Sequence, residues 1–306
     1  MSVFVIKLLA IVSMLIDHLG CYLRYRLLIS ADVYSVMRSI GRFAFPVYAF
    51  LIVNGYRKTH DVKRYLTRLI AFAVISQVPY ALFHNMYYTL PDEGLMIELG
   101  TRWFVCLIFV IVAGVAWFTT VRADWSAVWP VLALTMAVLR VEYRGVVILG
   151  KELDVFYTLA LGLAAIALLD AVNREERDYV KLLMQAIALF GAGFLIMDNA
   201  DYGLLGVALI AAIWIARDSA FSQAGIMALW CVVKFLVYGN GMSRFIGGIC
   251  CLIPVFLYNG KLGKPLKLGF YAIYPVHLAI LGRWSYTTSL YKPFVCCCHT
   301  EKNVVF

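Results

Sequence analysis

The feature that most constrains this chain is a series of long apolar segments. Four of them approach the roughly 20 residues that cross a bilayer as a helix: 3–28, 36–53, 65–83 and 103–121. Seven more follow at 125–139, 155–169, 182–197, 202–216, 221–238, 245–258 and 268–290. They are continuously apolar instead of alternating, which favours helices over barrel strands. The sequence therefore predicts an all-α, polytopic membrane protein with about 11 transmembrane helices, in a range of roughly 9 to 12.

The composition fits this class. Hydrophobic residues make up 63% and charged residues 15% of the 306 residues, and the mean hydropathy is +0.83. A soluble domain of this length needs a more polar surface. Because no linker rich in glycine, serine or proline interrupts the chain, we expect a single transmembrane domain over residues 1–290. A short extracytoplasmic, cysteine-rich tail is expected over 291–306.

The first apolar segment is expected to be a retained span. It is longer than the roughly 7–15 apolar residues of a signal peptide, and it contains Asp17 and His18. The densest group of basic residues, at 57–68, predicts a cytoplasmic loop. Counting from it places the N-terminus and the lysines of 261–267 in the cytoplasm. The net charge of +9 fits this topology and contact with anionic lipid, and we expect no nucleic acid partner.

Asp17 and His18 are the first ionisable residues at membrane depth. Such residues are costly in lipid and are functional hypotheses by default. Adjacent side chains on a helix diverge by about 100°. Asp17 and His18 therefore need different partners from other helices.

Arg42 is a candidate partner from the second span. It lies four residues before Pro46, and a proline within a helix leaves the carbonyl four residues earlier unpaired. Two interpretations stay open. Arg42 forms a structural ion pair with Asp17, or it binds an anion or a developing oxyanion beside a kinked backbone.

The last apolar segment brings a second histidine, His277, two residues after Pro275. Histidine titrates near neutral pH, so two histidines from the first and last helices, with Asp17 and Arg42, predict a proton-transfer site. The alternative for each histidine is a hydrogen-bonded structural role.

Other chemistry finds little support in the sequence. The cysteines inside apolar segments behave as small hydrophobic residues. The tail sequence Cys296-Cys297-Cys298-His299 offers metal ligands, disulfides or a plain chain end, but no second ligand cluster completes a zinc site, and we expect no bound metal. Phosphate-loop and dinucleotide motifs are missing from the sequence.

Several motifs in collinear order over most of the chain resemble the TraX family of membrane proteins. They are Lys7-Leu8-Leu9-Ala10, Met14-Leu15-Ile16-Asp17-His18-Leu19-Gly20, Gly41-Arg42-Phe43-Ala44-Phe45-Pro46, Ser76-Gln77-Val78-Pro79, Phe156-Tyr157-Thr158-Leu159, Asp201-Tyr202-Gly203, Tyr258-Asn259-Gly260-Lys261 and Tyr274-Pro275-Val276-His277-Leu278. Two departures stand out: the connection from His84 to Leu153 is long and holds two extra apolar segments, and Asp154 stands where an asparagine is more familiar.

The resemblance implies a multi-pass acetyltransferase of the bacterial cytoplasmic (inner) membrane. The family's namesake acetylates the N-terminal amine of conjugative pilin. The implied donor is acetyl-CoA, and the implied acceptor is an amine such as a pilin or peptide N-terminus, an amino sugar or a lipid-linked amine.

Together, the residues and the resemblance predict a mechanism. His18 is the general base, held by Asp17; Arg42 stabilises that carboxylate or the oxyanion; His277 is a second acid/base or an acetyl relay. The CoA phosphates are expected at Arg57, Lys58, Arg64, Arg68 and Lys261. Site-shaping residues are expected to be Gln77, Tyr274 and Asn259.

Two other classes of function remain open. A proton-coupled transporter or flippase would use the same Asp, His and Arg residues as a relay. An assembly or secretion factor without chemistry would keep its activity after loss of Asp17, His18 and Arg42.

Overall fold

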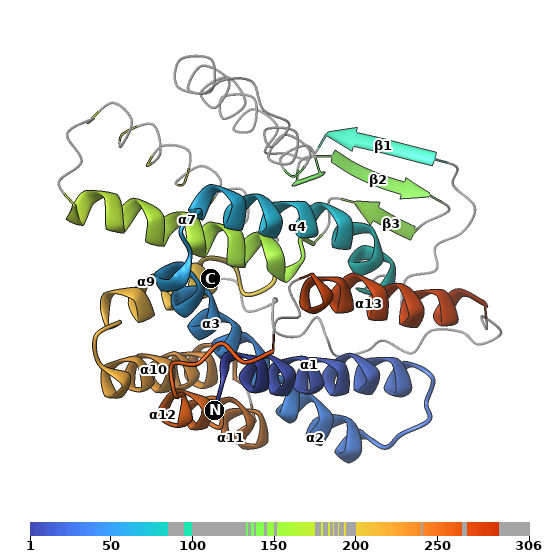
Figure 1. Ribbon diagram of the computed structural model, residues 1–306. Helices are drawn as coiled ribbons and strands as arrows, with labels where there is room; N and C mark the ends of the chain where they lie inside the picture. The colour runs from blue at the N-terminus through green and yellow to red at the C-terminus, as the bar shows by residue number, and fades with distance from the viewer. Residues whose placement is uncertain are drawn as a thin grey trace. The chain divides into compact units, whose positions relative to one another are not determined.

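The computed structural model describes residues 1–84, 95–99, 139–143, 146–149, 152–174, 200–239, 241–264 and 268–287, with a few single positions between 133 and 193 (Figure 1). The chain divides into two compact units, which are considered separately. Unit 1 comprises Met1–Val53, Met86–Tyr88 and Ala212–Phe306, and unit 2 comprises Asn54–Asn85 and Thr89–Ala211. The prediction of one transmembrane domain over 1–290 stays a prediction.

In its described residues, the regular secondary structure of unit 1 is entirely helical. Its helices are α1 (Val3–Tyr25), α2 (Ala31–Gly41), the start of α3 (Ala44–Lys58), the end of α9 (Gly203–Ile215), α10 (Ala220–Tyr238), α11 (Met242–Ile249), α12 (Leu252–Leu257) and α13 (Gly269–Thr287). Serine hydroxyls at Ser2, Ser30 and Ser219 accept backbone N–H groups and begin α1, α2 and α10. Gly239, in the left-handed region at φ 60°, ends α10.

The second predicted span contains a break in place of a proline kink. Helix α2 ends at Gly41 and α3 begins at Ala44, so Pro46 falls in the first turn of α3. A first-turn residue has no intrahelical partner for its N–H group, and a proline is therefore tolerated there. The sequence correctly predicted where the helix is interrupted. It predicted a kink, whereas the structure has a break between two helices.

Close packing in unit 1 depends on glycines. Helix α2 lies against α1 on one side and against α11 on the other. Gly247 of α11 touches the backbone of Ser39 in α2, and a methyl group there would overlap the Ser39 carbonyl. The backbones of α2 and α11 can approach this closely only because position 247 carries no side chain.

Unit 2 contains α4 (Val62–His84), which packs on α7 (Val155–Asn173), and a small antiparallel sheet. The sheet has the order β1 (Leu95–Leu99), β2 (Leu139–Tyr143), β3 (Val146–Leu149), with a register shift at Val141/Glu142. Thr158 donates to the Asp201 carbonyl over 2.5 Å and so ties α7 to the segment before α9.

The chain is a helical membrane protein, as predicted. By length and composition, five helical stretches of the described residues could cross a membrane: Val3–Tyr25, Ala31–Lys58, Val62–His84, Val155–Asn173 and Ala220–Tyr238. Shorter apolar helices are Gly203–Ile215, Met242–Leu257 and Gly269–Gly282. The described residues therefore do not reach the predicted count of about 11 transmembrane helices. The predicted segment 103–121 lies outside the described residues. The sheet was not predicted, because runs of four or five residues are too short for periodicity to separate strand from helix.

Replacing Gly247 with alanine tests the contact between α2 and α11. We expect Gly247→Ala to lower stability by roughly 1–3 kcal/mol, because the new methyl group meets backbone and not a flexible side chain. Thermal unfolding in detergent measures the effect. Gly225→Ala is the matched control, since no atom lies within 4 Å of a methyl group at that position of α10. Equal melting temperatures for Gly247→Ala and the wild type would contradict this packing.

Candidate functional site

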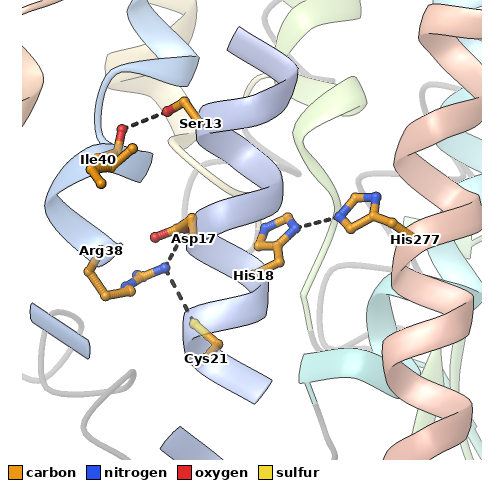
Figure 2. Close-up of polar contacts among 7 residues, drawn as sticks. All are labelled: Ser13, Asp17, His18, Cys21, Arg38, Ile40 and His277. Atoms are coloured by element: carbon orange, nitrogen blue, oxygen red, sulfur yellow. Dashed lines mark hydrogen bonds and ion pairs between the residues drawn. The ribbon is translucent and has the colours of Figure 1, made fainter. Parts of the chain in front are cut away.

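The first and last described helices bring two histidines into contact in unit 1. His18 of α1 and His277 of α13 point toward each other, with 2.7 Å between His18 Nδ1 and His277 Nε2 (Figure 2). Their rings are nearly parallel, with an interplanar angle of 8° and centroids 5.0 Å apart. The structure therefore joins the two histidines that the sequence analysis assigned to one site.

A second hydrogen bond assigns the protons of this pair. His277 Nδ1 lies 2.7 Å from the carbonyl oxygen of Ile273. A carbonyl only accepts hydrogen bonds, so Nδ1 of His277 carries a proton. In the neutral ring Nε2 is then the acceptor, and His18 Nδ1 donates to it. Neutral His18 thus has its lone pair on Nε2, which is the nitrogen that can take a proton from a substrate.

Tyr274 packs against both histidines. It is 5% exposed, and its ring centroid lies 6.2 Å from that of His18 and 5.7 Å from that of His277. Tyr274 lies about one turn before His277 on α13, and side chains three residues apart share a helix face. The predicted site-shaping residue is therefore part of the wall around the histidine pair.

The structure shows an ion pair between Asp17 and Arg38 (Figure 2), and the predicted pairing of Asp17 with Arg42 stays a prediction. Arg38 Nη1 lies 2.6 Å from Asp17 Oδ2, and both side chains are largely buried. Arg38 Nη1 also donates to Cys21 Sγ over 3.6 Å. Arg38 was not predicted from the sequence. The signal that could have found it is its position on α2, one turn before Arg42.

Two further contacts fix Asp17 against α2. Ser13, one turn before Asp17 on α1, donates to the Ile40 carbonyl over 2.6 Å. Gly41 lies so close to the Asp17 carboxylate that a methyl group at position 41 would overlap it. Asp17 therefore stabilises the contact between α1 and α2, while its neighbour His18 contacts α13.

Arg42 directly follows α2. Its backbone N–H donates to the Ser39 carbonyl over 3.2 Å, and its Cβ lies beside Gly248 of α11. Its side chain is part-buried. Stabilisation of an oxyanion by Arg42 stays a prediction.

The basic residues expected to bind the CoA phosphates lie in unit 2 and in a turn of unit 1. Arg57 and Lys58 end α3, while Arg64 and Arg68 belong to the first two turns of α4, and all four are exposed. Arg64 Nε lies 3.7 Å from Asp61 Oδ2, and an exposed pair of this kind contributes little to stability. The role of these four residues in binding the acyl donor stays a prediction.

Asn259 and Lys261 form a turn that is bonded to the start of α1. Asn259 Oδ1 accepts the N–H of Lys261 over 3.1 Å. Gly260 has φ 74°, which the glycine permits at no steric cost. The carbonyl of Lys261 accepts the N–H of Val3 over 2.9 Å. Asn259 thus shapes the backbone turn, and Lys261 extends from it with an exposed side chain.

Gln77, the remaining predicted site-shaping residue, holds the start of α7 in unit 2. Its Nε2 donates to the Glu152 carbonyl over 2.6 Å, and its Oε1 accepts the N–H of Asp154 over 3.2 Å. Gln77 is fully buried. Both ends of its amide form hydrogen bonds with backbone groups, as buried polar groups generally do. Its visible role is structural.

Asp154 lies beside Gln77 and begins α7. Its Oδ1 accepts the N–H of Phe156 over 2.8 Å. The Ser76 hydroxyl contacts both the Phe72 carbonyl and Asp154 Oδ2, but it has only one proton to donate. A protonated Asp154 removes this conflict, because it donates to Ser76 while Ser76 donates to Phe72. Burial raises the pKa of Asp154 to about 8, which agrees with a neutral carboxyl group.

No group of three metal-binding side chains occurs in the residues that the structure describes. The tail sequence Cys296-Cys297-Cys298-His299 lies outside them.

Replacing Asp154 with asparagine tests the protonated carboxyl group. Because the pKa of Asp154 is raised from about 3.9 in the unfolded chain, its contribution to stability is present at acid pH and is lost as pH rises toward 8. Asp154→Asn should therefore gain thermal stability over the wild type as pH rises from about 5 to about 8. Asp154→Ala, which removes the helix cap, should melt lower at both pH values. A pH-independent difference between Asp154→Asn and the wild type would contradict the assignment.

Known proteins are similar in sequence to this chain. The chain is 23% identical over 292 residues to the probable fimbrial assembly protein FimC, serogroup H1, of Dichelobacter nodosus, and the match covers 92% of this chain and 94% of that protein. It is 36% identical over 84 residues to the uncharacterized protein RP591 of Rickettsia prowazekii (strain Madrid E), covering 28% of this chain and 29% of that protein. No solved structure matches. The family model described as TraX protein matches residues 2–149 and 84–285, and the chain therefore belongs to the TraX family.

Proposed function

We propose that this protein is a membrane-embedded acetyltransferase, which moves an acetyl group from acetyl-CoA to an amine. The observation that carries the proposal is the hydrogen bond between His18 and His277, in which His18 Nε2 is the proton-accepting nitrogen. An amine that attacks a thioester must lose a proton, and a neutral imidazole in a water-poor site can take it. The TraX family membership supports the same chemistry.

The acceptor nitrogen attacks the acetyl carbonyl carbon, so a C–N bond forms and the negative charge moves to the carbonyl oxygen. His18 Nε2 takes the proton from the nitrogen. The C–S bond then breaks, and CoA leaves as a thiol after it receives that proton from His18. Arg42 is proposed to stabilise the oxyanion.

Asp17 and His277 have positioning roles in this proposal. His277 holds the ring of His18 in the tautomer with its lone pair on Nε2. Asp17 acts through Arg38 to hold α1 against α2. The contact between His18 and His277 thus supports a base oriented by a second histidine, and orientation of His18 by Asp17 stays a prediction.

The proposed acceptor is the N-terminal amine of a pilin-type protein. The relative from Dichelobacter nodosus is named as a probable fimbrial assembly protein, and the similarity extends over nearly all of both chains. We further propose that the protein lies in the bacterial inner membrane with a cytoplasmic N-terminus, where acetyl-CoA is available. The exposed turn residue Lys261 of unit 1 is a candidate ligand of the CoA phosphates, while a donor-binding role of Arg57, Lys58, Arg64 and Arg68 stays a prediction.

Proton-coupled transport is the second candidate, because two hydrogen-bonded histidines between helices also form a proton relay. Binding of acetyl-CoA separates the two functions. A transporter has no need of a CoA thioester, whereas an acetyltransferase must bind it and release CoA.

Replacing His18 with alanine tests the proposed base. We expect His18→Ala to lower acetyl transfer from acetyl-CoA to a pilin-type N-terminal peptide by about 10²- to 10⁴-fold, measured with the purified protein in liposomes. His84→Ala is the matched control, because His84 Nδ1 lies 3.2 Å from the carbonyl four residues earlier, as in His277, but belongs to α4. Wild-type turnover in His18→Ala would remove His18 from the mechanism.

Two substitutions of His277 test whether this residue positions His18 or takes a direct part in catalysis. His277→Phe removes the acceptor for His18 Nδ1, so we expect a smaller loss than in His18→Ala and an altered pH dependence of kcat. His277→Gln keeps an acceptor oxygen and should restore part of the activity. Equal losses in His277→Phe and His277→Gln would show that His277 does not act through this hydrogen bond.

A further inference from the structure

Three lysines gather at one end of unit 1. Lys7, Lys261 and Lys264 are called the α1-end lysines below. The backbone of the 261–264 turn is bonded to the start of α1, where Val3 donates to the Lys261 carbonyl over 2.9 Å and Phe4 to the Leu262 carbonyl over 3.1 Å. Lys261 and Lys264 are exposed. The chain therefore concentrates positive charge where α1 begins.

Lys7 is part-buried on α1, and the contact that the structure shows for its ammonium group is with a ring. Its Nζ lies 5.3 Å from the centroid of Phe270 at the start of α13. Among the described residues, no carboxylate forms an ion pair with Lys7 or with the other α1-end lysines.

The sequence explains the missing carboxylate. It contains no Asp or Glu before Asp17 and none between Asp218 and Glu301, so neither α1 up to that point nor α10 to α13 can supply one. An ammonium group in a mostly apolar setting is costly unless an anion accompanies it. An anion that accompanies the part-buried Lys7 must then come from outside this part of the chain.

The distance from this end to the histidine pair is set by α1. Lys7 and His18 are 11 residues apart, about three turns, which places them on one face and about 16.5 Å apart along the axis. Both contact α13, Lys7 through Phe270 and His18 through His277. Figure 1 shows α13 beside α1. An extended phosphopantetheine arm has a comparable length between its phosphate and its sulfur.

We propose that the α1-end lysines bind the phosphate groups of the acyl-CoA donor, with the pantetheine arm running along α1 toward His18. This inference rests on the proposed acetyltransferase function and adds a binding site to it. Phosphate esters are the ligand class, because compact ammonium groups bind phosphate as point charges. A phospholipid headgroup carries the same chemistry, and the experiment below separates the two sources.

Binding of CoA and of pantetheine, which lacks the phosphates, tests the proposal without reference to turnover. The purified protein is placed in phosphatidylcholine nanodiscs, and both affinities are measured by calorimetry. We expect Lys7→Gln and Lys261→Gln each to weaken CoA binding by about tenfold and to leave pantetheine binding unchanged. Lys7→Arg should bind CoA as the wild type does. Lys234→Gln is the matched control, since Lys234 Nζ also lies over a ring, 3.9 Å from the Tyr238 centroid, on α10.

Three outcomes would overturn the proposal. Unchanged CoA affinity in Lys7→Gln and Lys261→Gln would place the phosphates elsewhere, while CoA binding by the wild type would leave the proposed function intact. If the variants lose binding of phosphatidylglycerol but not of CoA, the anion is a lipid headgroup. If the wild type binds neither CoA nor pantetheine, the proposed function fails as well. Should Lys7→Gln not fold, the exposed Lys261→Gln still decides between these results.

Discussion

The hydrogen bond between His18 and His277 is the interaction on which the rest of this account depends. It joins the first helix to the last described helix, across 259 positions of sequence. It also has a direction, because the Ile273 carbonyl fixes the proton on His277 Nδ1 and so leaves the lone pair of neutral His18 on Nε2. A base with a defined tautomer is what distinguishes a candidate catalytic site from two histidines that merely pack together.

Neighbouring residues of α1 contact different helices around this pair. Adjacent side chains on a helix point about 100° apart, so Asp17 faces α2 while His18 faces α13. Asp17 pairs with Arg38, and Gly41 gives its carboxylate room. A buried ion pair of this kind is weak evidence for stability, but it sets which face of α1 lies on α2. The orientation of His18 toward α13 follows from that choice.

The sequence predicted the site better than it predicted the details of the fold. Asp17, His18 and His277 stood out because ionisable groups are rare in apolar segments, and the structure shows a side-chain contact for each. Arg38 was missed because two arginines one turn apart are equivalent in sequence, and only the approach of α2 to α1 shows that Arg38 contacts Asp17. The break before Pro46 and the sheet depend on backbone geometry over a few residues, which hydrophobic patterns do not encode. Asp154 looks like an ordinary acidic residue until its burial and its contact with Ser76 are known.

The central claim is that His277 sets the tautomer of His18, and the ring nitrogens of His18 report this directly. The measurement is ¹⁵N NMR of the histidine-labelled full chain in detergent at neutral pH, with His18 assigned by its loss in His18→Ala. The account predicts a protonated Nδ1 and an unprotonated Nε2 for His18, with a shift toward the other tautomer in His277→Phe. A protonated Nε2 in the wild type, or a His18 spectrum that does not respond to His277→Phe, would contradict it.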